Sequence, residues 1–168
     1  MPDTFVKIAS VTVGAGGSST ITFSSIPNTY TDLCLKLSVR SNRSGAEDYI
    51  SVRFNGSATS QTVRRLEGSG SSAYSSNEAN NWSFIADAAP QTSNTFTSVD
   101  FYVPNYAGSN NKSFSSDAVM ENNATTAYSS LVAGLWSNTS AITQVEVSSA
   151  VASFVQYSTA VLYGIKNS

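Results

Sequence analysis

The sequence contains no histidine and a single cysteine, Cys34. Without histidine the chain cannot build a Ser-His-Asp or Cys-His catalytic centre, and it cannot hold zinc or iron through imidazole. One thiol excludes an intrachain disulfide and a thiolate metal site, so we interpret Cys34 as a small, half-buried strand residue. The most common routes to nucleophilic and metal-assisted catalysis are therefore closed to this chain.

Charged residues are scarce as well. They make up 12% of the 168 residues and leave a net charge of −2 at pH 7. No block of basic residues stands out, so we expect no nucleic-acid partner. The N-terminus has no apolar core behind a basic start, and no apolar run approaches the length of a membrane span. We therefore expect neither a signal peptide nor membrane association.

Serine, threonine and asparagine fill much of the chain and number 32, 16 and 14. These residues suit strand surfaces and turns and are poor in helix interiors. No stretch of ten or more residues shows a convincing helical period. Hydrophobic residues still make up 40% of the sequence, which is enough for one core. We expect a single domain over residues 1–168.

Alternation of apolar and polar residues predicts strands through most of the chain. The clearest is 32–40, in which leucine and valine occupy every second position. Residues 10–13 and 19–23 flank a glycine-rich turn and predict a hairpin. Residues 49–54 end at an Asn-Gly turn signal, which predicts 61–66 as the returning strand.

The rest of the chain follows the same pattern. Residues 67–81 are the longest polar stretch, and we expect them to form an exposed loop. Further strands are expected at 82–87, 96–103, 112–120, 128–136, 142–147 and 154–165. About ten short strands separated by turn signals predict an all-β fold, an antiparallel β-sandwich. This number of strands favours the jelly roll, although one sequence leaves a different sandwich topology open.

Eleven carboxylates carry the remaining chemistry. A glycosidase needs two of them flanking one bond, and the candidate pairs are Glu47 with Asp48 and Asp117 with Glu121. Adjacent residues such as Glu47 and Asp48 diverge on a strand, so they are poorly placed for this role. No Asp-x-Asp spacing indicates a calcium loop. We therefore expect no enzyme activity, no metal and no cofactor.

Tyrosine and arginine are the residue types that anchor protein contacts when they are exposed. Tyr74 and Tyr106 lie in expected loops, and Tyr128 begins an expected strand. Arg64 and Arg65 form a basic pair. We name these five as candidate protein-contact residues. In particular, we expect the loop 104–112 to form a subunit or capsid contact through Tyr106.

Several segments of the chain resemble virion proteins of tailed bacteriophages, mainly marine and freshwater phages, including those of cyanobacteria. The segments are "YTDLCLKLSVRSNRSG" (30–45), "VRFNG" (52–56), "RRLEGSGSSAYS" (64–75), "VPNYAGSNNKSFSSD" (103–117), "ENNATTAYSSLVAGLW" (121–136) and "FVQYSTAVLYGI" (154–165). Residues 58–65 depart from the pattern because they lack a tyrosine-bearing strand before the arginine pair. The resemblance implies a β-sandwich structural protein without a known catalytic motif, and it transfers no functional residue.

Within a virion, a compact sandwich without a docking segment or shaft favours a capsid decoration, or cement, protein. We expect it to bind the major capsid protein and other copies of itself, as a homotrimer, in a virion assembled in the host cytoplasm. Two other classes stay open. A tail- or vertex-associated adhesin would use the sandwich as a glycan-binding module, since jelly rolls also serve as lectins. A carboxylate glycosidase is the third class.

Overall fold

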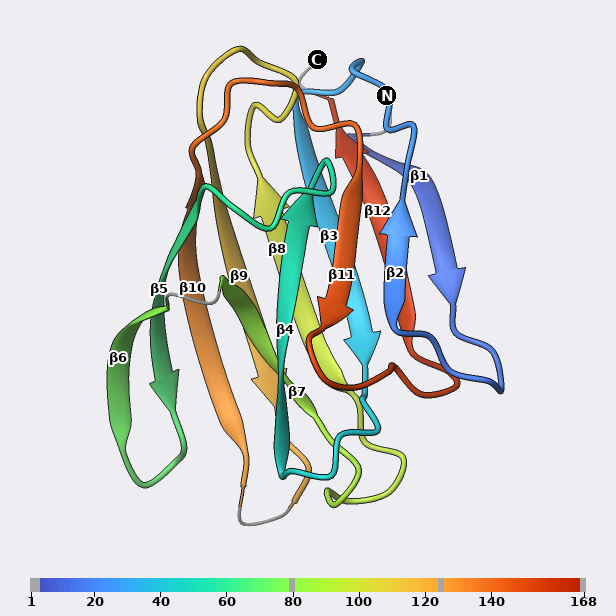
Figure 1. The fold of residues 1–168 in the computed structure, drawn as a ribbon, viewed down its shortest axis with the longest axis vertical. Helices are drawn as coiled ribbons and strands as arrows, with labels where there is room; N and C mark the ends of the chain where they lie inside the picture. The colour runs from blue at the N-terminus through green and yellow to red at the C-terminus, as the bar shows by residue number, and fades with distance from the viewer. Residues whose placement is uncertain (1–3, 79–80, 124–125, 167–168) are drawn as a thin grey trace.

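The computed structural model describes residues 4–78, 81–123 and 126–166, and these residues form twelve β-strands and no helix (Figure 1). The strands are β1 (Phe5–Thr12), β2 (Thr20–Phe23), β3 (Asp32–Val39), β4 (Glu47–Phe54), β5 (Gln61–Gly68), β6 (Ala73–Glu78), β7 (Trp82–Asp87), β8 (Thr97–Val103), β9 (Lys112–Met120), β10 (Tyr128–Trp136), β11 (Val145–Ser149) and β12 (Thr159–Ile165). Within this part of the chain, no helix is long and apolar enough to cross a membrane.

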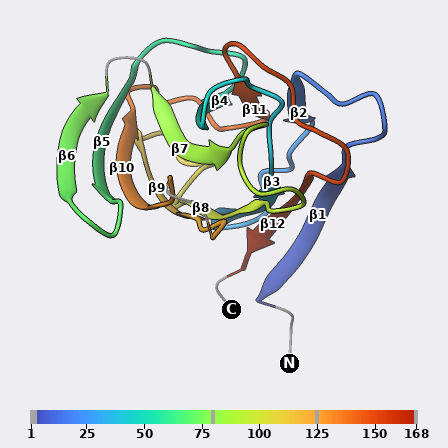
Figure 2. The same cartoon turned by 90° about the horizontal axis from the view of Figure 1, so that it is seen from below.

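The strands form two sheets that pack face to face (Figure 2). The larger sheet has the order β1-β12-β3-β8-β9-β10-β5-β6, and the smaller has the order β2-β11-β4-β7. Neighbouring strands in both sheets are antiparallel. The expected antiparallel β-sandwich is therefore confirmed.

Eight of the strands form four nested pairs, two in each sheet. The outermost pair along the chain is β1 with β12, and the next is β2 with β11. Inside these come β3 with β8 and then β4 with β7. The other four strands lie outside these nested pairs. The pairs β5–β6 and β9–β10 both join the larger sheet beyond β8, and they extend it to eight strands.

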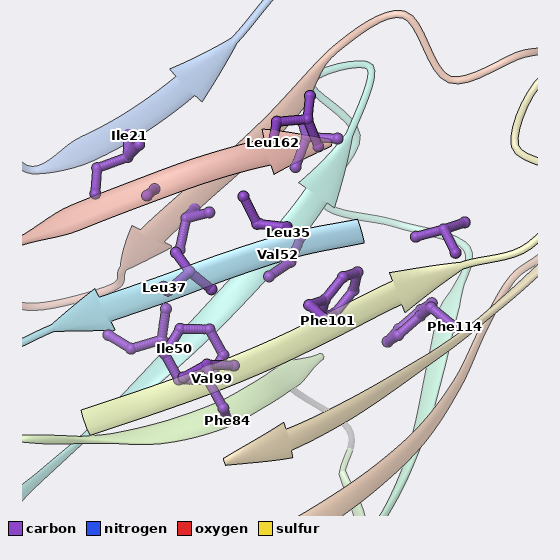
Figure 3. Close-up of a cluster of buried hydrophobic side chains, with 14 of the residues drawn as sticks. Ile21, Leu35, Leu37, Ile50, Val52, Phe84, Val99, Phe101, Phe114 and Leu162 are labelled. Atoms are coloured by element: carbon purple, nitrogen blue, oxygen red, sulfur yellow. The ribbon is translucent and has the colours of Figure 1, made fainter. Parts of the chain in front are cut away.

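The core lies between the two sheets, where every second residue of most strands is buried. Figure 3 shows side chains from both sheets meeting there, among them Ile50, Val52 and Phe101. Aromatic rings fill the centre: the Phe54 ring centroid lies 5.5 Å from Trp136 and 5.7 Å from Phe114. Burial of these large side chains is the main stabilising contribution to the sandwich.

Both predicted hairpins are wrong. Residues 10–13 and 19–23 belong to opposite sheets, because β1 pairs with β12 and β2 pairs with β11. The strand at 61–66 likewise does not return beside β4. Alternation shows which side of a strand is buried but not which strand lies beside it, so a chain that crosses between sheets shows the same pattern as a hairpin.

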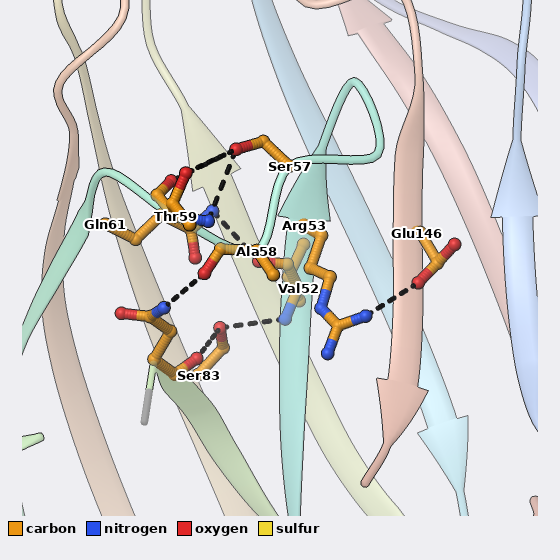
Figure 4. A network of polar contacts seen from close by, with 9 residues as sticks. Val52, Arg53, Ser57, Ala58, Thr59, Gln61, Ser83 and Glu146 are labelled. Carbon is orange, nitrogen blue, oxygen red and sulfur yellow. Dashed lines mark hydrogen bonds and ion pairs between the residues drawn. The ribbon is translucent and has the colours of Figure 1, made fainter. Parts of the chain in front are cut away.

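Polar contacts hold the crossing from β4 to β5 (Figure 4). The expected Asn55-Gly56 turn forms, with φ of 53° and 71°, and the Ser57 amide donates to the Phe54 carbonyl at 2.9 Å. The chain then turns away to the other sheet. The buried Gln61 side chain donates to the Val52 carbonyl at 3.2 Å and so ties the start of β5 to β4.

The expected loop 67–81 is also wrong, because it contains the edge strand β6, which pairs with β5. The side chains of residues 73–77 in this strand are exposed or half-buried, so they show no apolar alternation. The expected strand 142–147 is displaced to β11, and the expected strand 154–165 begins only at Thr159. The strands predicted at 82–87, 112–120 and 128–136 match β7, β9 and β10.

Candidate binding surface

The outer face of the larger sheet carries a groove of about 810 Å³ over strands β8, β9, β10, β5 and β6. The buried residues of these strands face the core, so the residues between them face outward. The outward lining residues are Arg64, Leu66, Ser75, Asn77, Asp100, Tyr102, Ser115, Asp117, Leu131 and Ala133. We call this surface the outer groove.

Two neighbouring rows of side chains cross the outer groove from strand to strand. The first row consists of Lys36, Asp100, Asp117, Leu131, Leu66 and Ser75. The second row consists of Tyr102, Ser115, Ala133, Arg64 and Asn77. Directly opposed residues of an antiparallel pair have Cβ atoms about 4.5–5.5 Å apart. The register therefore brings charged, hydroxyl and apolar groups from six strands together.

Two carboxylates face each other in the first row, Asp100 on β8 and Asp117 on β9. The Lys36 Nζ lies 2.5 Å from the Asp100 Oδ1 on the other side, and the hydrogen bond to Asp100 raises the pKa of Lys36. Like charges directly opposite each other destabilise a sheet. The sheet thus holds an acidic pair here at a cost to its own stability.

Tyr102 stands at the β8 side of the outer groove with a fixed side chain. Its hydroxyl donates to the Asp32 Oδ2 at 2.7 Å, and the Asn105 amide donates to the Asp32 Oδ1 at 2.9 Å. The bond to Asp32 is the main reason that the pKa of Tyr102 rises to about 12. The residue is 37% exposed. A partly exposed ring whose hydroxyl is held in place offers apolar surface to a ligand.

Part of the lining of the outer groove is apolar. Leu66 and Leu131 lie directly opposite each other and are 52% and 54% exposed. Val119 and Leu135 are exposed on the same face of β9 and β10. Exposed apolar side chains gathered on one face of a soluble protein often mark a surface that binds something.

Of the five predicted contact residues, Arg64 alone lines the outward face of this groove with its side chain. Arg65 points the other way, is 8% exposed, and forms an ion pair with Glu67 at 3.0 Å. Its guanidinium also lies 5.3 Å from the Tyr49 ring centroid. The prediction of Arg65 as an exposed contact is therefore wrong, because consecutive strand residues face opposite sides of the sheet.

Tyr74 and Tyr128 lie near Glu67, on the inward side of their strands. Partial burial, the nearby Glu67 carboxylate and hydrogen bonds to Glu67 and Tyr128 raise the pKa of Tyr74. Tyr74 is 42% exposed and Tyr128 is half-buried. Their role as contacts stays a prediction, as does that of Arg64.

Tyr106 is fully buried, so the predicted contact through an exposed Tyr106 is wrong. Its hydroxyl donates to the Pro27 carbonyl and accepts the Tyr30 amide at 3.4 Å. Its backbone carbonyl accepts the Ile142 amide at 3.0 Å. The side chain thus anchors the 104–111 connection to the molecule instead of presenting it to a partner.

Lys112 closes the same connection from the other end. Its fully buried side chain donates through Nζ to the carbonyls of Gly108 at 2.7 Å and Asn110 at 2.5 Å. Burial lowers the pKa of Lys112. Carbonyl oxygens that would otherwise lack a partner are thereby satisfied. This stretch is a folded strand connection, as its turn-forming residues predict.

A second exposed feature lies in the connection between β11 and β12. Val151 and Tyr157 are 73% and 68% exposed, more than any other large hydrophobic residue described. Tyr157 has a left-handed backbone with φ of 72°, whereas the other described non-glycine residues with positive φ are asparagine or serine. Sequence reasoning missed this feature because it placed Tyr157 inside a strand. No sequence pattern marks a tyrosine with this backbone.

The carboxylate pairs considered for catalysis do not assemble a catalytic site. Asp48 is buried and Glu47 half-buried on alternate sides of β4. Asp117 lies on the outer face of β9, and Glu121 follows the end of that strand. Within residues 4–78, 81–123 and 126–166, no three Asp, Glu or Cys residues gather in a way that could hold a metal ion. The opposed pair Asp100 and Asp117 escaped sequence reasoning because strand pairing alone brings it together.

Comparison with known proteins adds nothing to this geometry. No protein-family model, curated protein or solved structure matches the chain. Two surfaces of the molecule are therefore the candidates for function. They are the outer groove and the end of the sandwich that carries Val151 and Tyr157.

Proposed function

We propose that the protein is a non-enzymatic structural component of a tailed-phage particle, a decoration protein that binds between capsomers and stabilises the shell. The resemblance of its segments to phage virion proteins supports this proposal. Its partners are then the major capsid protein and other copies of the chain, as a homotrimer. The observation that carries the proposal is the exposed Tyr157 at one end of a rigid sandwich.

The strand order supports the jelly roll as the topology of this proposed protein. Pairing of first with last and second with second-last, across two sheets, is what results when one long hairpin is rolled into a sandwich. Jelly rolls occur in viral capsid and lectin domains. On this interpretation, β5–β6 and β9–β10 are insertions that widen one sheet.

Tyr157 is held in a costly conformation by its surroundings. A bulky residue with positive φ is a genuine outlier, and such conformations cost on the order of 1–3 kcal/mol. The Tyr157 amide donates to the Val13 carbonyl at 3.0 Å, and the next amide, of Ser158, donates to the Val155 carbonyl at 3.1 Å. These bonds fix the backbone, while the ring stays in solvent.

Fixed presentation of an aromatic ring suits a binding anchor. Tyrosine is enriched among residues that dominate binding energy, and rigid anchors lose little entropy on binding. The connection itself is braced, because Phe154 exchanges two backbone hydrogen bonds with Ser18, at 2.7 and 3.0 Å. The β1–β2 connection, which contains Ser18, and the β11–β12 connection, which contains Phe154, lie at the same end of the sandwich (Figure 1). Symmetric copies on a shell would multiply such a modest contact.

The first experiment measures the copy number of this chain relative to the major capsid protein in purified particles, by quantitative mass spectrometry. A decoration protein is expected at a ratio approaching one to one. A ratio of a few per cent would place it at the tail or a vertex and overturn the proposal.

The second experiment replaces the anchor without disturbing the fold. Tyr157→Gly suits the left-handed backbone, so its urea midpoint is expected to be no lower than that of wild type while binding to expanded shells falls at least tenfold. Leu131→Ala, which removes another exposed apolar side chain, is the matched control and should bind shells normally. Equal shell binding by Tyr157→Gly and wild type would contradict the proposed contact.

A further inference from the structure

We propose that the outer groove is a binding site for a neutral oligosaccharide. This site is separate from the shell contact at Tyr157, so it would give a decoration protein a second activity, attachment of the particle to a glycan surface. The inference rests on the lining of the groove and does not depend on the proposed function.

The lining matches the two-sided chemistry of a sugar ring, which has apolar C–H faces and a rim of hydroxyl groups. Tyr102, Leu131 and Leu66 offer exposed apolar surface. Asp117, Arg64 and Asn77 offer exposed hydrogen-bonding groups within the same groove. Ligand sites usually combine an apolar lining with a few convergent polar groups. The volume of about 810 Å³ lies within the range of such sites.

The opposed carboxylates identify the kind of polar partner. Ionised carboxylates only accept hydrogen bonds, so a ligand group that bonds to Asp100 or Asp117 must be a donor. Lys36 supplies one to Asp100, whereas Asp117 faces the apolar Leu131 on its other side. Hydroxyl groups are donors without charge, and they would satisfy the pair without the repulsion that a phosphate or nucleic-acid backbone would meet. A neutral glycan therefore fits better than a polyanion.

The spacing of polar and apolar side chains across the outer groove also favours a glycan over a flat protein surface. Polar and apolar groups change from one strand to the next, from Asp117 to Leu131 in one row and from Ala133 to Arg64 in the other. Neighbouring strands are about 4.8 Å apart, so the change occurs on the scale of one sugar ring. Protein contacts usually bury a larger apolar centre surrounded by a polar rim.

The site is already organised in the free protein. Asp32 holds the Tyr102 hydroxyl at 2.7 Å, and Lys36 holds Asp100. The remaining lining residues lie on paired strands, so their backbones cannot move independently. A ligand would then lose little affinity to ordering of the protein.

The test is a glycan array of neutral oligosaccharides with the purified wild-type chain, followed by calorimetric titration of the best ligand. Amide shifts of Ser115 and Ala133 in NMR spectra should map the ligand to the outer groove. Asp117→Asn is expected to weaken binding about tenfold, the loss of one charge-assisted hydrogen bond. The same variant should raise the urea midpoint, because it removes the like-charge contact with Asp100.

Two variants separate this proposal from the proposed function. Tyr157→Gly should bind the glycan as wild type does, and Asp117→Asn should bind shells as wild type does. Absence of any neutral ligand on the array would overturn the inference and leave the shell contact intact. Self-association of the wild type that Leu131→Asp abolishes, without glycan binding, would overturn it too and assign the face to a second copy of the chain.

Discussion

At the scale of single residues, Tyr106 shows how one hydroxyl fixes a long connection. It bonds to the Pro27 carbonyl and to the Tyr30 amide from inside the molecule. We expect Tyr106→Phe to lower the free energy of unfolding by about 0.5–1.5 kcal/mol, because the Pro27 carbonyl and the Tyr30 amide lose a hydrogen-bond partner. Urea denaturation followed by tryptophan fluorescence measures the change.

Tyr157→Phe is the matched control, since it removes a hydroxyl from an exposed ring. Its urea midpoint should stay within error of wild type. If Tyr106→Phe were as stable as the wild type, the hydroxyl would not be what anchors the connection. Packing of the ring alone would then have to explain its burial.

Exposure of individual side chains is what the sequence predicted least well. Asn105 and Gly108 beside Tyr106 are turn formers, so the segment was expected to be exposed, and the connection is indeed a turn. Whether the ring turns inward depends on the space beside Pro27 and Tyr30, which lie 79 and 76 positions away along the chain. Such distant packing leaves no local signal.

At the scale of strands, Gly134 permits close contact between β10 and β9. A Cβ atom at this position would overlap the Phe114 ring, which is packed against Phe101 with centroids 5.1 Å apart. We expect Gly134→Ala to destabilise the protein by about 1–3 kcal/mol, as overpacking of a filled core does. Thermal unfolding followed by circular dichroism measures the change.

Phe114→Leu tests the cause of that loss. In a double-mutant cycle, Gly134→Ala should cost less when it is combined with Phe114→Leu, because the ring that clashes is absent. Gly68→Ala is the control within a strand, since no atom lies within 4 Å of the added Cβ. Equal costs with and without Phe114→Leu would exclude the Phe114 ring as the source.

Strands with one buried face could be predicted from the sequence, and those without one could not. Alternation over 112–120 and 128–136 predicts β9 and β10 to the residue. Residues 73–78 are serine, asparagine and other surface residues on both sides, so β6 escapes the same rule. Its position depends on hydrogen bonding to β5, which any sequence without proline can supply.

At the scale of the whole molecule, the outer groove depends on strand order. Its lining residues fall between positions 64 and 133 and lie on β5, β6, β8, β9 and β10. The sequence predicts the outward positions of most of these strands but not that β10 lies between β9 and β5. The pairs β5–β6 and β9–β10, separated along the chain by β7 and β8, must meet before the groove exists. A sandwich was therefore predictable, whereas the outer groove was not.

The same strand order sets the speed of folding. β1 pairs with β12 over nearly its whole length, and the Lys166 amide donates to the Thr4 carbonyl at 3.0 Å, so the ends of the described chain meet. Pairing of first with last strand makes many contacts non-local, and non-local contacts slow folding. A circular permutant with a short Gly/Ser linker between β12 and β1, and new ends between Ala15 and Gly16, turns that pairing into a local hairpin.

We expect this permutant to keep the fold, because Ala15 and Gly16 lie in an exposed turn and both strands keep their partners. It should refold several-fold faster than the parent chain in stopped-flow tryptophan fluorescence. A parent chain with the same linker appended at its C-terminus controls for the added residues. If the permutant folded at the parental rate, β1 would pair with β12 only after the rate-limiting step. Pairing of the inner strands, from β4 with β7 outward, would then determine how fast the sandwich forms.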